Sequence, residues 1–165
     1  MHPDDLDHDD LRDELDAENT AGVNFYAEEV PMPFDDDTAD RLSAWVEEAF
    51  ATEEAAMHAV VFIFCDDEYL LELNREHLQH DYYTDILTFP LHDDGEPIDG
   101  EMYISIDRVR ENATTLGISF EKELCRVMIH GVLHLIGYDD HTDDDRNHIR
   151  AREDAYLLQV TDIAQ

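Results

Sequence analysis

The fold is decided by residues 119–141, SFEKELCRVMIHGVLHLIGYDDH. The second half of this stretch is apolar nearly all round, which is typical of a helix buried at the centre of a domain. Ser119 suits the N-terminal cap of such a helix, and Gly137 suits the position just past its end. We therefore predict a central helix between these two residues, followed by a turn that brings residues 139–141 back beside it.

Two histidines lie four residues apart on this predicted helix. Residues at that spacing share one face, so His130 and His134 can direct their ring nitrogens at one point. Imidazole nitrogens and carboxylate oxygens are ordinary zinc ligands, and three protein ligands leave a fourth position for water. The pattern predicts a zinc site. A pair of buried structural histidines and a non-catalytic metal site are the alternatives.

The residue between the histidines argues against a peptidase. Zinc peptidases with the pattern H-E-x-x-H use the glutamate beside the first histidine as a general base. Here that position is Gly131. Asp139 is the nearest alternative base, and the catalytic residues stay unknown at this stage.

The rest of the chain alternates between strand-like and helix-like stretches. An acidic start, residues 1–21, reads as an extension that is disordered or weakly helical, and residues 22–165 read as one domain. Because the predicted helices gather late in the chain, we expect an α+β domain in which a small mixed sheet packs against about five helices. The predicted strands are 23–27, 58–65, 84–91 and 101–106, the predicted helices are 36–54, 66–78, 107–116, the central helix and 142–160, and residues 93–100 are expected to form a loop.

The composition limits the environment and the partners. The chain has 43 Asp and Glu against 10 Lys and Arg, a formal net charge of −33. We interpret this as a halophilic acidic surface, because such carboxylates stay hydrated when salt screens their repulsion. Such a charge argues against nucleic acid as a partner at ordinary salt, because binding to phosphates normally draws on Lys and Arg, and we expect no DNA partner. The sequence has no long apolar run and no secretory signal pattern, so we expect a cytoplasmic protein with no membrane partner, in which Cys65 and Cys125 are buried free thiols.

Four stretches in this order resemble the bacterial YbeY family of endoribonucleases and rRNA maturation factors. They are LNREHLQHD, TDILTFPL, GEMYIS and HGVLHLIGYDD, and the resemblance runs from about residue 60 to about residue 155. It implies a single-strand-specific endoribonuclease that depends on one Zn²⁺ ion and acts in late 16S rRNA 3′-end maturation and ribosome quality control. The implied partners are single-stranded RNA, the small-subunit rRNA precursor and the ribosome. The alternatives are a non-catalytic ribosome assembly factor with a structural zinc, and a zinc-dependent hydrolase of another substrate.

The third metal ligand has two candidates. The family usually has a histidine ten residues after the first, where this chain has Asp140, with His141 one place later. Counting from His130 favours Asp140, whereas a third imidazole would favour His141. We predict Asp140 and keep His141 as the alternative.

Several cationic and aromatic residues are candidates for contact with RNA. Many family members have an arginine where this chain has Leu78, and the cations that could replace it are Arg75, Lys122 and Arg126. His80, Tyr82 and Tyr83 either stack on unpaired bases or lie half-buried at a strand edge. Asn74 is expected to hydrogen-bond between a helix and a strand.

Overall fold

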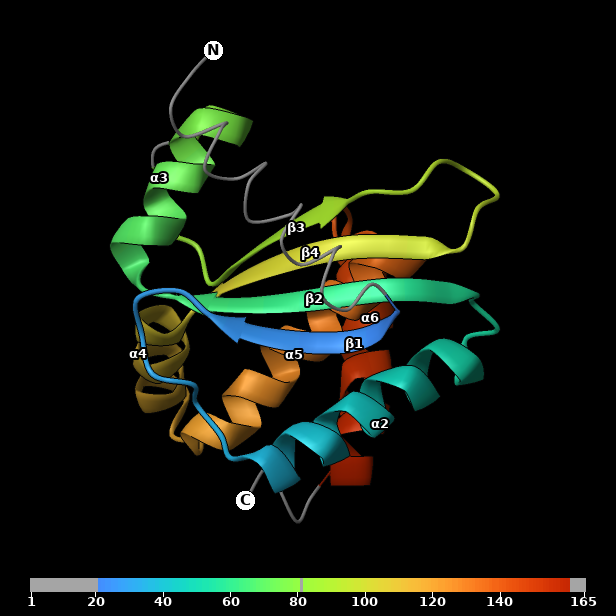
Figure 1. Ribbon diagram of the computed structural model, residues 1–165, viewed down its shortest axis with the longest axis horizontal. Coiled ribbons are helices and arrows are strands. Elements are labelled where there is room, and N and C mark those ends of the chain that lie inside the picture. The colour runs from blue at the N-terminus through green and yellow to red at the C-terminus, as the bar shows by residue number, and fades with distance from the viewer. Residues whose placement is uncertain (1–20, 81, 161–165) are drawn as a thin grey trace.

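The computed structural model describes residues 21–80 and 82–160. Its strands and helices follow the predicted order, and the four strands and five α-helices confirm an α+β fold with a small mixed sheet (Figure 1). The predicted acidic extension, apart from Ala21, lies outside the described residues. The elements are β1 (Gly22–Ala27), α2 (Asp36–Thr52), β2 (Met57–Cys65), α3 (Asp67–Leu78), β3 (Ile86–Pro90), β4 (Ile98–Ser105), α4 (Ile106–Leu116), α5 (Phe120–Ile136), α6 (Asp143–Leu157) and a 3₁₀ turn, η1 (Leu158–Val160).

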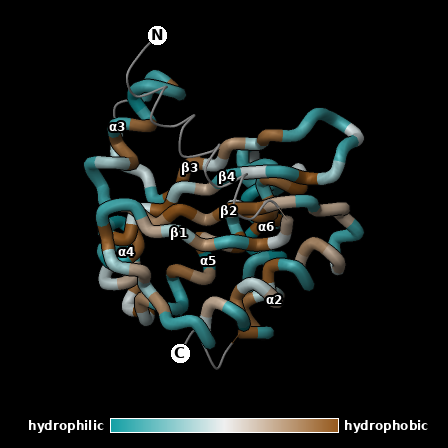
Figure 2. The backbone as a smooth tube through the Cα atoms, in the orientation of Figure 1, coloured by the Kyte–Doolittle hydropathy of each residue, from teal (hydrophilic) through white to brown (hydrophobic). Residues whose placement is uncertain are grey.

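The sheet has the strand order β1-β2-β4-β3. Strands β1, β2 and β4 run parallel, and β3 pairs antiparallel with β4. Strand β2 is buried from Val60 to Cys65, and this continuous apolar run places it inside the sheet. Figure 2 shows the contrast between the hydrophobic β2 and the hydrophilic loop that joins β3 to β4.

The helices form two unequal layers. Helices α2, α5 and α6 pack on one face of the sheet, where the larger core lies, and α3 packs against the smaller core on the other face (Figure 1). Within the described residues, no helix is long and apolar enough to cross a membrane. Both cysteines are buried and free, as predicted.

Helix α5 lies so close to the sheet that glycine is needed at the contact. A Cβ atom on Gly131 would lie 2.5 Å from Sδ of Met102 and 2.7 Å from Cδ1 of Ile86. These separations are far below van der Waals contact, so a larger residue here would force the buried side chains of Met102 and Ile86 to shift. The position that holds a catalytic glutamate in H-E-x-x-H peptidases is therefore a packing position in this fold.

The predicted ends of α5 are confirmed. The side chain of Ser119 accepts a hydrogen bond of 3.1 Å from the backbone N–H of Lys122. At the other end Gly137 has a φ of 126°, a conformation that favours glycine, and its N–H donates to the carbonyls of Leu133 and His134 at 3.1 Å. The cap turns the chain back towards α5, and the loop 137–142 follows.

The predicted bounds of β4 were wrong at both ends, whereas those of the other strands differ by at most two residues. Residues 93–100 were expected to form a loop, but β4 already begins at Ile98, and its predicted last residue, Ile106, belongs to α4. Ile98 pairs with Met57 of β2, and its N–H donates to the carbonyl of Ala56 at 2.8 Å. Pairing with β2 extends β4 to residues before Gly100. Because glycine weakens the local sequence pattern of a strand, this extension was not predicted.

Candidate metal centre

Three side chains meet where the loop 137–142 passes the C-terminal half of α5. Nε2 of His130 and Nε2 of His134 are 3.0 Å apart. Oδ2 of Asp140 lies 3.4 Å from Nε2 of His134 and 3.9 Å from Nε2 of His130. Their donor atoms all lie within 4.8 Å of one another, which makes them a group able to hold a metal ion.

The spacing of this group fits zinc. With zinc bonds of about 2.0–2.2 Å and a tetrahedral arrangement, two ligand atoms lie about 3.3–3.6 Å apart. The three measured separations bracket that range. Two imidazoles and a carboxylate are also a donor set that zinc accepts.

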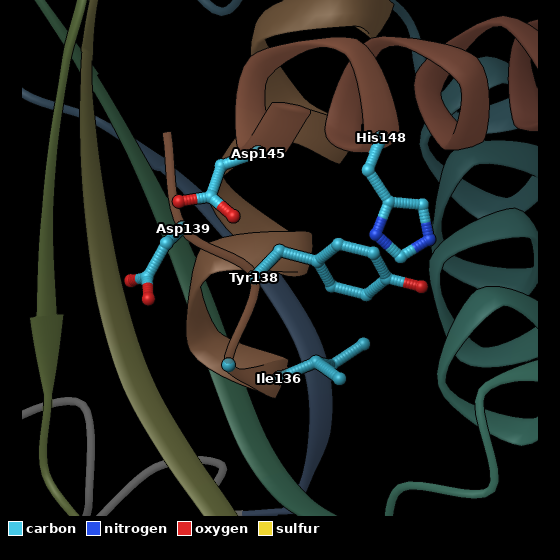
Figure 3. Close-up of a pocket in the computed structure, with 6 residues that line it drawn as sticks. Ile136, Tyr138, Asp139, Asp145 and His148 are labelled. Atoms are coloured by element: carbon cyan, nitrogen blue, oxygen red, sulfur yellow. The ribbon is translucent and has the colours of Figure 1, made fainter. Parts of the chain in front are cut away.

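His141 and Asp139 lie outside the group. The His141 side chain is 81% exposed, and its Nε2 lies 3.9 Å from Oδ1 of Asp139. Asp139 lines an open pocket of about 380 Å³ beside Tyr138, Asp145 and His148 (Figure 3). In Figure 3 the carboxylates of Asp139 and Asp145 lie to one side of the pocket, away from the Tyr138 ring and His148. Of the two candidates for the third ligand, Asp140 is the one that the structure brings to the histidines.

Carboxyl groups near His130 affect the pKa of its ring. Burial raises the pKa of Asp85 above its ordinary value, although a protonated His130 would lower it. At His130, burial lowers the pKa, but the hydrogen bond and charge of Glu153, together with the charges of Asp85 and Asp140, outweigh burial, so the pKa is raised overall. These carboxylates therefore favour a positive charge at the His130 ring.

The loop that carries Asp140 is fastened at both ends. Nη1 of Arg146 donates to the backbone carbonyls of Asp140 at 3.1 Å and of His141 at 3.3 Å. The hydroxyl of Tyr138 donates to Oε1 of Glu53, at the end of α2, at 2.6 Å. These contacts tie the backbone of the loop to α6 and α2 on either side of the Asp140 side chain.

Glu153 is a member of the site that the sequence analysis missed. Its Oε2 lies 2.6 Å from Nδ1 of His130, and its side chain is only 7% exposed. A signal was present in the sequence, because Glu153 shares the helical spacing of Ile149, Tyr156 and Leu157, which are all buried. A glutamate on the apolar face of a helix calls for a buried partner.

The three cations considered for RNA contact differ in their exposure and in their ion pairs. Nε of Arg126 lies 3.6 Å from Oε1 of Glu123, and its Nη1 lies 3.5 Å from Oε1 of Glu153 and 3.4 Å from Oδ1 of Asp154. The positive charge of Arg126 is therefore paired with acidic side chains. Arg75 and Lys122 are exposed, as is Leu78.

The aromatic residues before β3 lie at the surface. Tyr82 and Tyr83 are both about half exposed, at 56% and 49%, and the Tyr82 ring stacks on His80. The buried Asn74 donates to the Tyr82 carbonyl at 2.9 Å, so it joins α3 to the loop before β3 rather than to the strand itself.

Comparison with known proteins identifies similar sequences and a similar structure. The family model described as Endoribonuclease YbeY matches residues 27–161. The Endoribonuclease YbeY of Flavobacterium psychrophilum is 48% identical over 113 residues, which are 68% of this chain and 80% of that protein. The one from Porphyromonas gingivalis is 41% identical over 141 residues, 85% of this chain and 91% of that protein. A solution structure of a protein from Thermotoga maritima is 31% identical, with a TM-score of 0.61 over 84% of this chain and 88% of that chain.

Proposed function

Because the chain belongs to the endoribonuclease YbeY family, we propose that it is an endoribonuclease that depends on one zinc ion held by His130, His134 and Asp140. The observation that carries the proposal is the meeting of these three donors at separations that fit zinc. The similar relatives are named endoribonucleases, which supports a phosphodiester in RNA as the bond that is cut.

The residues of the chain prepare the site for a cation. The two imidazoles project from one face of a buried helix, and the anchored loop presents the carboxylate to them. When bound, zinc supplies a Lewis acid that polarises a phosphoryl oxygen and lowers the pKa of a coordinated water. Asp140 is about half exposed, which leaves the group open on the side from which a large substrate must approach.

We infer that the substrate is single-stranded RNA of the small-subunit rRNA precursor, cut during maturation of its 3′ end, and that the protein works on the ribosome in the cytoplasm. The YbeY resemblance supports this substrate. The exposed rings of Tyr82 and Tyr83 support unpaired RNA in particular, because an aromatic ring stacks on any unpaired base. Both residues lie in the loop before β3, where the hydroxyl of Tyr83 donates to Oε1 of Glu68 on α3 at 2.8 Å.

The test separates a catalytic zinc from a structural one. The purified protein is analysed for zinc, stripped with a chelator, and assayed on a single-stranded RNA in molar KCl before and after zinc is restored. We expect cleavage to stop and return while the far-UV circular dichroism stays that of the folded protein. Loss of the fold with the metal would favour an assembly factor with a structural zinc, and cleavage that survives stripping would refute metal dependence.

The ligand set is tested by two neighbouring substitutions. Asp140→Ala is expected to lose most of the bound zinc and the cleavage activity, and His141→Ala to keep both. The opposite result would mean that the loop shifts by one residue and presents a third imidazole.

A further inference from the structure

Glu153 lies directly behind the first histidine of the proposed metal centre. Its Oε2 is 2.6 Å from Nδ1 of His130, and the other ring nitrogen, Nε2, faces His134 and Asp140. The two nitrogens of this ring therefore have different partners. Because an ionised carboxylate can only accept a hydrogen bond, the proton of a neutral His130 ring lies on Nδ1. The lone pair on Nε2 is then directed at the point where the three donors meet.

The carboxylate of Glu153 is itself held in place. Its Oε1 lies 3.5 Å from Nη1 of Arg126, and Arg126 and His130 are one turn apart on the same face of α5. Glu153 comes from α6, between the buried Ile149 and Tyr156. Packing of α6 on α5 thus brings one carboxylate to both an arginine and a histidine, and each of its oxygens has a separate partner.

We propose that Glu153 is a positioning residue for the metal centre. By accepting the hydrogen bond from Nδ1–H, it selects the tautomer of His130 that can bind a metal through Nε2, and it fixes the rotation of the ring. A ligating histidine whose second nitrogen donates to a carboxylate is oriented and made more basic by it, and loss of such a partner commonly weakens metal binding about 10–100-fold. The proposal rests on the proposed function, because it takes His130 to be a ligand.

A purely structural role would be different. If Glu153 only neutralises Arg126 between α5 and α6, its replacement should affect stability and leave His130 unchanged. Glu123 offers the matched control, because it is a glutamate of the same burial, at 5% exposed, whose Oε1 lies 3.6 Å from Nε of Arg126. Its carboxylate thus shares Arg126 with Glu153 but belongs to α5 rather than α6.

The experiment compares Glu153→Gln with Glu123→Gln in the full chain. Zinc affinity is measured by competition with a chromophoric chelator, and the tautomer of His130 is read from the ¹⁵N shifts of the metal-free protein at a pH where the ring is neutral. For Glu153→Gln we expect a zinc Kd at least about tenfold higher and a loss of the Nδ1–H tautomer preference. For Glu123→Gln we expect a Kd within about twofold of the wild type and an unchanged tautomer.

Two results would overturn the proposal: a Glu153→Gln protein that keeps both the zinc Kd and the tautomer, or a Glu123→Gln protein that loses as much affinity. If Glu153→Gln does not fold, Glu153→Asp replaces it, because it keeps the charge for Arg126 but withdraws the carboxylate from His130 by one methylene. The tautomer is measured without metal. A wild-type protein that binds no zinc would therefore refute the proposed function, while the shifts would still report on the Glu153 contact.

Discussion

Replacing Glu53 with glutamine should markedly lower the free energy of unfolding, although the two side chains have nearly the same shape. The Glu53 side chain is only 10% exposed at the end of α2. Its Oε1 accepts from the hydroxyl of Tyr138 at 2.6 Å, and its Oε2 accepts from Nη2 of Arg152 at 2.7 Å and from the hydroxyl of Tyr156. One carboxylate thus joins α2, α6 and the loop that carries Asp140.

The size of the effect follows from these donors. A hydrogen bond to a charged group is worth about 1.5–3 kcal/mol, and glutamine keeps one acceptor oxygen but turns an NH₂ group towards the other donors. Breaking a fully buried ion pair costs about 3–5 kcal/mol, but Arg152 is a third exposed, so water replaces part of the lost contact. We expect Glu53→Gln to lower the free energy of unfolding at pH 7 by about 2–3 kcal/mol.

The loss should depend on pH with a definite sign. Burial raises the pKa of Glu53, but hydrogen bonds from Tyr138, Tyr156 and Arg152 outweigh it, and the pKa lies below its ordinary value. A carboxylate whose pKa is lowered by folding stabilises fully above its unfolded pKa of about 4.3, and this stabilisation is lost as pH falls through the folded pKa. The difference between wild type and variant should therefore shrink below about pH 4.

Urea unfolding at constant molar KCl, at pH 7 and again near pH 3.5, measures both quantities. Glu48→Gln is the control, because Glu48 is an exposed residue of the same helix, and we expect it to change stability by less than about 0.5 kcal/mol. A Glu53→Gln loss no larger than that of the control, or one that does not decrease on acidification, would refute the reasoning.

Three further outcomes are expected. Gly131→Ala should lower the free energy of unfolding by about 1–3 kcal/mol, since its Cβ meets Met102 and Ile86, and a gain in urea stability would contradict this close approach. Arg146→Ala should weaken zinc binding by freeing the Asp140 backbone while changing stability by about 1 kcal/mol or less; unchanged zinc affinity in the same chelator competition would show that the loop holds itself. The melting temperature should fall as KCl is lowered from about 1 M to below about 0.1 M, where the Debye length grows from about 3 Å to about 10 Å, and a flat profile would remove the halophilic interpretation.

The sequence predicted the elements of this fold better than their arrangement. Helix α5 was predictable from its apolar run and from the caps at Ser119 and Gly137, because both signals are local. The strand order and the early start of β4 at Ile98 were not, because they depend on pairing with a strand some forty residues away.

The residues of the proposed metal centre were likewise predictable only in part. His130 and His134 were predictable because helical geometry alone puts them on one face, and counting favoured Asp140 over its neighbour. Glu153 was missed because it lies in an acid-rich helix, where one buried carboxylate looks like the many solvated ones beside it. Its place on the apolar face of α6 indicated a buried partner, but that the partner is His130 depends on how α6 packs against α5.

The central claim is that a metal held by His130, His134 and Asp140 lets this protein cut RNA internally. A circular single-stranded RNA tests it most directly, because a circle has no end for an exonuclease to attack. In molar KCl, we predict that the zinc-loaded wild type opens the circle to a linear molecule of the same length, whereas the metal-free protein and Asp140→Ala leave it closed. A circle that stays closed with the zinc-loaded protein, or that opens equally fast without metal or with Asp140→Ala, would contradict the account.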